Sequence, residues 1–218
     1  MSNLVNAERV TMTYGTRTLL DGISLGLSRG EVVGVVGRNG AGKTTLLQVL
    51  AGTLVPDGGR ITHTGHLSIG FLQQADDVAA DASVRGLIVD DAPDHIWAAN
   101  PRTRAIVEHL LADVDLDAQA ISLSGGERRR VALVTLLLAE HDLLILDEPT
   151  NHLDVEAVDW LAKELRNLQA ANVAMLVVSH DRWFLDAICT RIWEVHDGAV
   201  HAYDGGYAAY VLAKTDRV

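Results

Sequence analysis

The sequence has few cysteines, few basic residues and no long apolar segment. Cys189 is the only cysteine among 218 residues, so no disulfide can form within the chain, which indicates a structural thiol in a reducing compartment. Lys and Arg number 18 against 29 for Asp and Glu, a formal net charge of -11. That balance argues against a broad basic surface for nucleic acid and leaves room only for a local basic patch.

Segments that would direct the chain to a membrane are also missing from the sequence. The longest mainly apolar segments, residues 131–139 and 173–178, fall well short of the roughly 18 residues that a spanning helix needs. The N-terminal residues Met1, Ser2 and Asn3 are polar and lack the basic and apolar regions of a secretory signal. We therefore expect a cytoplasmic protein that does not itself cross a membrane.

The N-terminal part of the sequence alternates in the way that strands do. Apolar residues alternate over residues 4–14 and 23–27, which predicts antiparallel strands joined by a turn at Asp21 and Gly22. Residues 32–36 are apolar on both faces, as expected of a central parallel strand covered by helices.

The remaining segments predict one α/β domain over residues 1–218. Residues 75–121 carry mostly helical patterns, and we expect a small helical subdomain inserted at about residues 76–122. From residue 124 onward, helices alternate with strands as in parallel α/β units. The expected elements are strands at 60–63, 67–71, 143–146 and 173–178, a helix opening at 124, a helix at 155–168 and a hairpin at 191–203.

Residues 37–44, with the sequence GRNGAGKT, match the pattern G-x-x-x-x-G-K-[ST]. Small residues in such a loop let backbone N–H groups converge on phosphate oxygens at the start of a helix. Lys43 is then expected to reach the β- and γ-phosphates, and the hydroxyl of Thr44 to bind Mg²⁺. An ordinary glycine turn is the alternative, and it is disfavoured because a strand precedes the loop and a helix follows it.

Two carboxylates end the predicted strand at 143–146. Asp147 and Glu148 would lie at the sheet edge where α/β proteins place their ligands. We expect Asp147 to hold Mg²⁺, directly or through water, and Glu148 to polarise an attacking water. Alone, such a pair is more often a solvated loop or a helix cap; the preceding phosphate loop favours the functional interpretation.

Three further side chains follow predicted strands. His180 comes just after the strand at 173–178, where it could sense the γ-phosphate, although a lone histidine there is usually structural. Gln74 follows the strand at 67–71 and could contact metal or water through its amide. Gln73 is a rival for that role.

Residues 123–127, with the sequence LSGGE, precede a predicted helix. Ser124 and Glu127 have the spacing of a capping box. Capping does not explain the two consecutive glycines, which are costly in a first helical turn and suit close approach to a phosphate. For each of the arginines at 128–130, a solvated basic face is the more probable interpretation.

Together, these motifs resemble the nucleotide-binding domain of the ABC ATPases over essentially the whole chain. The resemblance implies the RecA-like parallel-sheet core of P-loop NTPases with an N-terminal antiparallel subdomain, and it implies ATP and Mg²⁺ as cofactors. By this resemblance the catalytic residues are Glu148, His180 and Lys43, and the metal-binding residues are Thr44, Gln74 and Asp147. The implied nucleotide contacts are Tyr14, Gly37, Arg38, Asn39, Gly40, Ala41, Gly42, Lys43, Thr44, Thr45, Gln74, Ser124, Gly125, Gly126, Glu127 and Asp154.

Within that family, residues 147–154, with the sequence DEPTNHLD, resemble the ABC-F form, in which Asn-His precedes Leu-Asp. Residues 179–186 and 203–207 with Tyr210 resemble it as well. ABC-F proteins are soluble and generally act on ribosomes. They normally contain two such domains joined by a charged linker, whereas one motif set is present here, and the short stretch at 75–121 leaves little room for an arm insertion.

By the resemblance, residues 123–127 are the signature sequence of the family. It implies two nucleotides held between two domains, with the phosphate loop of one facing the signature of the other. We expect a partner domain, either in the same longer chain or as a homodimer, and slow ATP hydrolysis without it. The ribosome is a further expected partner. The alternatives are an ABC transporter ATPase subunit and a nucleotide-gated module on ribosomes or DNA.

Overall fold

A six-stranded sheet forms the centre of the computed structural model, which describes residues 3–73, 79 and 81–216. Its strand order is β5-β6-β7-β3-β8-β9. Neighbouring strands are parallel except for the last pair, β8 and β9, which is antiparallel. The strands are β3 (Val32–Val36), β5 (Ile69–Leu72), β6 (Leu143–Asp147), β7 (Ala174–Val178), β8 (Arg191–His196) and β9 (Ala199–Asp204).

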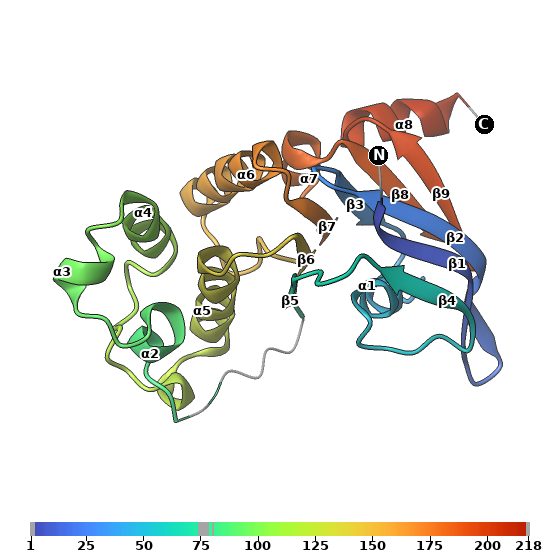
Figure 1. The fold of residues 1–218 in the computed structure, drawn as a ribbon. Coiled ribbons are helices and arrows are strands. Elements are labelled where there is room, and N and C mark those ends of the chain that lie inside the picture. Colours follow the sequence, from blue (N-terminus) through green and yellow to red (C-terminus); the bar gives the residue numbers. More distant parts are fainter. Residues whose placement is uncertain (1–2, 74–78, 80, 217–218) are drawn as a thin grey trace.

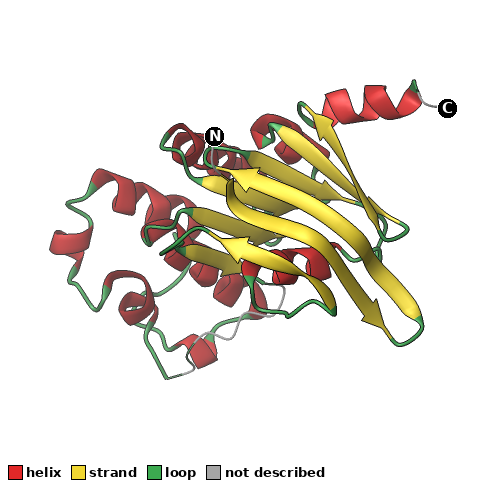
Figure 2. Ribbon diagram, turned by 45° about the vertical axis from the view of Figure 1, so that its right-hand side comes forward, coloured by secondary structure: helices red, strands yellow, loops and turns green. Residues whose placement is uncertain are grey.

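A second, three-stranded antiparallel sheet has the order β2-β1-β4. Its strands are β1 (Asn3–Tyr14), β2 (Arg17–Ser28) and β4 (Gly58–His63), and in Figure 2 the long strands β1 and β2 cross in front of the central sheet. The predicted antiparallel pair is present, but the turn predicted at Asp21 and Gly22 is wrong. Both residues lie inside β2, where Gly22 has a φ of 64° beside an irregular register, and the chain turns at residues 15–16 instead.

Alternate residues of the central strands enter two separate cores. In β6, Leu144 and Leu146 join the core shared with the helices α5 (Gly125–Leu138), α6 (Val155–Ala170) and α7 (Arg182–Ile188). Leu143 and Ile145 join the core shared with α1 (Lys43–Ala51) and the antiparallel sheet. The central strands are therefore covered on both faces, as their uniformly apolar sequences predict.

The interval between β5 and α5 is helical, with α2 (Val84–Val89), α3 (Asp94–Trp97), α4 (Pro101–Leu110) and the 3₁₀ turn η1 (Ala120–Ser122). These helices lie to one side of both sheets (Figure 1). Two contacts attach α4 to α6: an ion pair of 2.8 Å between Arg102 and Glu164, and a stack of the His109 and Trp160 rings at 5.0 Å. The inserted subdomain at about residues 76–122 stays a prediction.

The structure contains two short helices that were not predicted from the sequence. They are α7 and the C-terminal α8 (Tyr207–Thr215). The cap of α7 is Asp181, whose carboxylate accepts a hydrogen bond from the Phe184 N–H at 3.0 Å. Across the described ranges of the chain, every helix is too short or too polar to cross a bilayer.

Candidate functional site

The phosphate loop connects the end of β3 to the start of α1. Gly37, at its first position, has a φ of 154°, and a Cβ atom there would lie 2.5 Å from the carbonyl oxygen of Val195. Gly42, at the N-cap of α1, has a φ of 104°. Among the described residues, no side chain caps this helix by a hydrogen bond, so its first N–H groups are available to an anion.

A cavity of about 430 Å³ lies beside this loop. It brings together the phosphate loop, the carboxylates that end β6 and the histidine that follows β7. The residues that line it are Leu19, Asn39, Gly40, Gly42, Lys43, Thr44, Thr45, Asp147, Glu148, Val178 and His180. Nine of the 19 site residues proposed from sequence therefore meet in one place, and they include all three proposed catalytic residues.

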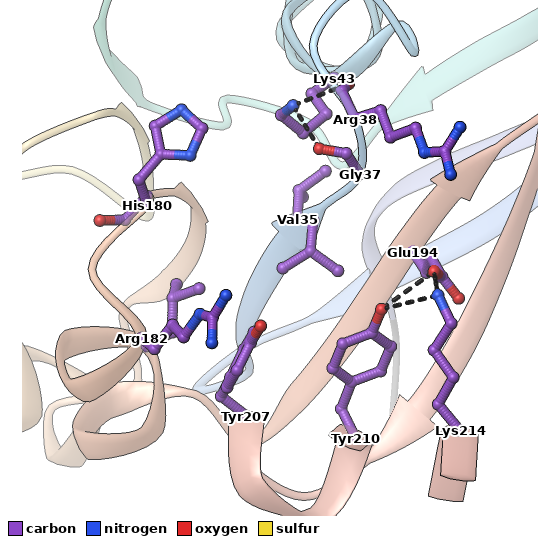
Figure 3. Close-up of a pocket in the computed structure, with 13 residues that line it drawn as sticks. Val35, Gly37, Arg38, Lys43, His180, Arg182, Glu194, Tyr207, Tyr210 and Lys214 are labelled. Atoms are coloured by element: carbon purple, nitrogen blue, oxygen red, sulfur yellow. Dashed lines mark hydrogen bonds and ion pairs between the residues drawn. The ribbon is translucent and has the colours of Figure 1, made fainter.

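Lys43 is the first residue of α1, and its side chain folds back into the phosphate loop. Its Nζ donates hydrogen bonds to the carbonyl oxygens of Gly37 at 2.8 Å and Arg38 at 3.1 Å (Figure 3). Burial lowers the pKa of Lys43, against the raising effect of the nearby Glu148 and Asp147 carboxylates. The ammonium group is thus bonded to the loop backbone and lies within electrostatic range of both acids.

Thr44 and Asp147 form the part of the cavity that suits a cation. The Thr44 hydroxyl donates to Oδ2 of Asp147 at 3.3 Å. Oδ1 of Asp147 is buried without a hydrogen-bond partner among the described residues, and burial raises the pKa of this carboxyl. The same described residues hold no group of three or more His, Cys, Asp or Glu side chains that suits a metal. One carboxylate and one hydroxyl are what Mg²⁺ uses when phosphates and waters complete its shell.

Glu148 and His180 contact each other in the lining of the cavity. Glu148 is 6% exposed and has a φ of 53°. Its Oε2 accepts a hydrogen bond from the His180 backbone N–H, and its Oε1 lies 3.2 Å from Nε2 of the same histidine. Burial raises the pKa of Glu148, the His180 hydrogen bond lowers it, and the net shift is upward. Raised basicity suits a carboxylate that takes up a proton.

A second cavity of about 310 Å³ lies behind the loop and shares Lys43 and His180 with the first (Figure 3). Glu194 of β8, 8% exposed, stands in its wall. This carboxylate accepts hydrogen bonds from the hydroxyls of Tyr203 at 3.3 Å and Tyr210 at 2.9 Å, and it pairs with Lys214. Sequence reasoning missed this cluster because its members come from β8, β9 and α8 and form no local motif.

The signature residues 124–127 lie outside the described lining of both cavities. Ser124 caps α5 in a complete capping box with Glu127, as predicted. A Cβ atom on Gly126 would lie 3.2 Å from the ring of His152. Asp154 caps α6 and accepts a hydrogen bond from the Ala157 N–H at 2.8 Å. Within one chain, these motifs therefore form a surface apart from the phosphate loop.

The interpretation of the three arginines as a solvated basic face holds only for Arg128, which is exposed. Arg129 donates hydrogen bonds to backbone carbonyls that include that of Gln73. Arg130 pairs with Asp113 at 2.5 Å, and its guanidinium also donates to the Leu110 carbonyl at 3.0 Å. The other two expectations are therefore wrong, because these side chains satisfy carbonyls and a carboxylate that α5 alone does not reveal.

The remaining candidate residues from the sequence are Tyr14 and the two glutamines. Tyr14 is 53% exposed at the end of β1 and pairs with Arg17 across the hairpin. The Arg17 guanidinium would lie 3.7 Å from a Cβ atom on Gly40, so this hairpin adjoins the phosphate loop. Gln74 lies outside the described residues, and Gln73 is exposed.

The pattern of the family described as ABC transporter matches residues 20–151. This chain belongs to that family. The matched interval contains the phosphate loop, the signature residues and both carboxylates at the end of β6. The sequence-based assignment to the ABC ATPases is thus confirmed.

Relatives match this ABC domain over nearly its whole length. The energy-dependent translational throttle protein EttA of Mycobacterium tuberculosis is 36% identical over 97% of this chain and 44% of its own length. ABC transporter F family member 5 of Arabidopsis thaliana is 32% identical over 99% of this chain and 37% of its own length. The predicted ABC-F resemblance is confirmed, and the domain spans less than half the length of these relatives.

Solved structures share the fold. An ATP-binding subunit of an ABC transporter superposes with a TM-score of 0.79 at 20% identity, over 92% of this chain and 90% of that one. A chain in the complex of archaeal ribosomal stalk protein aP1 with ribosome recycling factor aABCE1 gives a TM-score of 0.80 at 29% identity, over 97% of this domain and 42% of that chain. The expected α/β class, with its parallel core and antiparallel β subdomain, is confirmed.

Proposed function

We propose that this ABC domain binds Mg-ATP and hydrolyses it as one half of an ABC-F protein that acts in translation. The observation that carries the proposal is the single cavity that joins Lys43, Thr44, Asp147, Glu148 and His180. A phosphate loop, a cation-binding pair and a buried carboxylate are the parts that phosphoryl transfer to water requires.

Each of these side chains has a distinct proposed role. Lys43 and the loop N–H groups hold the β- and γ-phosphates. Thr44 and Asp147 would hold Mg²⁺, which neutralises charge that develops on the phosphate oxygens. Glu148, with its raised pKa, orients and deprotonates the attacking water. His180, which already contacts Glu148, stabilises the γ-phosphate.

The separation of the signature from the phosphate loop supports a partner requirement. Residues 124–127 adjoin His152 rather than the cavity of Lys43. We propose that Ser124 to Glu127 and Asp154 contact the nucleotide of a second ABC domain, which in turn supplies its own signature here. The length of the relatives, of which the chain covers 44% and 37%, favours a second domain in the same protein.

A role in translation rests on the relatives. One is named a translational throttle, and a similar chain was solved in a complex of a ribosomal stalk protein and a ribosome recycling factor. Because the domain has a formal net charge of -11, we propose that segments outside it provide the ribosomal RNA contact. Co-sedimentation of the full-length Glu148→Gln protein with ribosomes, with and without ATP, tests this role, and equal absence from the ribosome pellet in both conditions would contradict it.

The hydrolytic role is tested by Glu148→Gln together with Glu140→Gln, the same change at an exposed glutamate. The first variant is expected to bind ATP as the wild type does and to lose turnover, because the amide cannot accept a proton from water. The second is expected to keep both. Phosphate release is measured with the second ABC domain present, and nucleotide affinity is measured on each purified chain. Turnover by Glu148→Gln at the wild-type rate would refute the assignment.

A further inference from the structure

Arg129 extends from α5 to the ends of two strands of the central sheet. Its guanidinium donates hydrogen bonds to the backbone carbonyls of Gln73, just after β5, and of Asp147, the last residue of β6. It also reaches the carbonyl of Glu148 at 3.5 Å. A single side chain thus contacts the backbone of both acids in the candidate site.

The carbonyls at this edge depend on such a donor. β5 is the edge strand and pairs only with β6 among the described strands. Leu72 and Leu146 are the last residues paired between β5 and β6, so among the described residues this ladder gives the carbonyls of Gln73 and Asp147 no further partner, although Asp147 still pairs with Val178 of β7 on its other side. A planar guanidinium has several donors in a fixed arrangement, so it can hold carbonyls of two segments at once.

The backbone at Glu148 makes this contact more consequential. Its φ of 53° is a conformation that non-glycine residues rarely adopt. The Glu148 N–H donates to the carbonyl of Val178 at 2.7 Å, and the Arg129 guanidinium lies at its carbonyl. The peptide groups on either side of the strained residue are therefore held from β7 and from α5, which fixes the direction in which its carboxylate points.

The two neighbouring arginines show that this arrangement is specific to one position. Arg128 is exposed, and its backbone N–H makes the helical bond to Ser124. Arg130 points to Asp113 and the Leu110 carbonyl, away from the acids. Only Arg129 of the three reaches β6 in the described structure.

We propose that Arg129 is a positioning residue for ATP hydrolysis, which holds the main chain of Asp147 and Glu148 so that the Glu148 carboxylate faces the γ-phosphate and its water. The inference rests on the proposed function and adds a component to it that touches neither nucleotide nor water. The signature residues begin the same helix, α5. Arg129 therefore connects two parts of the domain: the surface that we propose contacts the partner domain, and the acids Asp147 and Glu148 of this domain's own site.

The test compares Arg129→Ala with Arg128→Ala, which removes the same charge one position earlier on α5. ATP hydrolysis is measured with the second ABC domain present, and Mg-ATP affinity and far-UV circular dichroism are measured on the purified chains. For Arg129→Ala we expect kcat to fall about 10–100-fold, the range for residues that orient a catalytic group. KM and Mg-ATP affinity should stay within about threefold, because the phosphate loop is untouched. Arg128→Ala should match the wild type.

Arg129→Lys separates positioning from charge and folding. Lysine keeps the charge but has one nitrogen, so its kcat should fall below that of the wild type while the circular dichroism spectrum and nucleotide affinity stay unchanged. A wild-type kcat for Arg129→Lys would overturn the inference. If Arg129→Ala does not fold, the lysine variant alone decides.

Glu148→Gln, measured in parallel, distinguishes failure of this inference from failure of the proposed function. An inactive Glu148→Gln beside a fully active Arg129→Ala would overturn the role of Arg129 and leave the proposed function standing. An active Glu148→Gln would overturn the proposed function itself. A loss of turnover by Arg129→Ala that equals its loss of folded protein would show a purely structural arginine and so overturn the inference.

Discussion

The hydroxyl of Tyr210 fastens α8 to the central sheet, and its removal should have a measurable cost. It donates a hydrogen bond of 2.9 Å to Oε1 of Glu194, and Tyr210 is 7% exposed. Tyr210→Phe removes that hydroxyl and little else. Glu194 keeps its interactions with Tyr203 and Lys214, so the carboxylate loses one partner and retains two.

The expected loss follows from the charge and burial of the acceptor. A hydrogen bond to a charged group contributes about 1.5–3 kcal/mol. Because two partners of Glu194 remain, we expect a value near the lower end, about 1.5–2 kcal/mol. For a domain of this size, 1 kcal/mol corresponds to roughly 2–4 °C in Tm. Tyr210→Phe should therefore lower Tm by roughly 3–8 °C.

The pH dependence of this loss has a definite sign. Burial raises the pKa of Glu194, but hydrogen bonds from Lys214 and Tyr210 outweigh burial and hold the pKa below its ordinary range. A carboxylate with a lowered folded pKa stabilises the protein above its unfolded pKa, about 4.3, and loses that effect as pH falls through the folded value. The difference between wild type and Tyr210→Phe should thus be constant from pH 7 to pH 5 and shrink below about pH 4.3.

Urea unfolding at several pH values measures this difference. Tyr207→Phe is the matched control, because in the described structure its hydroxyl has no recorded hydrogen bond and its ring lies in the same aromatic group, 5.6 Å from that of Tyr210. Equal stability losses for the two variants, or a Tyr210→Phe loss that does not shrink in acid, would refute this account of the Glu194 cluster.

Three further predictions concern the loop, the cation and the signature helix. Gly37→Ala should reduce Mg-ATP affinity at least roughly tenfold in a binding titration, since its Cβ would lie 2.5 Å from the Val195 carbonyl oxygen and displace the loop; unchanged affinity would contradict it. Asp147→Asn should raise the Mg²⁺ concentration for half-maximal hydrolysis by more than about tenfold, and a magnesium titration that overlays the wild type would exclude Asp147 as a ligand. Ser124→Ala should cost about 1 kcal/mol by removing the capping box with Glu127, or roughly 2–4 °C in thermal unfolding of the chain alone; an unshifted Tm would show that the cap is dispensable.

The parts of this molecule that sequence predicts are those with local physical causes. The uniformly apolar segment at Val32–Val36 is a central strand because both of its faces are buried. The spacing of Ser124 and Glu127 predicts a capping box because each side chain serves the backbone three residues away. The hairpin at residues 191–203 is present as predicted, in the antiparallel pair β8 and β9.

The errors and omissions share a different cause. Gly22 has the left-handed φ of a turn residue, but it lies at an irregularity in the register of β2. The backbone N–H of its neighbour Asp21 donates a hydrogen bond to the carbonyl of Gly198. From the sequence, Arg129 is interpreted as an exposed surface charge, because its hydrogen bonds to the ends of β5 and β6 form only in the folded protein. The partners of Glu194 are drawn from separate elements in the same way. Contacts of this kind depend on tertiary packing and have no signature within a short window of sequence.

Cys189 has a practical consequence for spectroscopy. The residue is 8% exposed, and burial raises the pKa of its thiol to about 12, so almost no thiolate is present at neutral pH. Maleimide dyes should leave the folded chain unlabelled. A cysteine introduced at exposed Arg128 would then be the only reactive thiol in the molecule. A single fluorophore at position 128 would lie beside the signature residues and report when a partner domain covers them. Cys189 would not have to be replaced first.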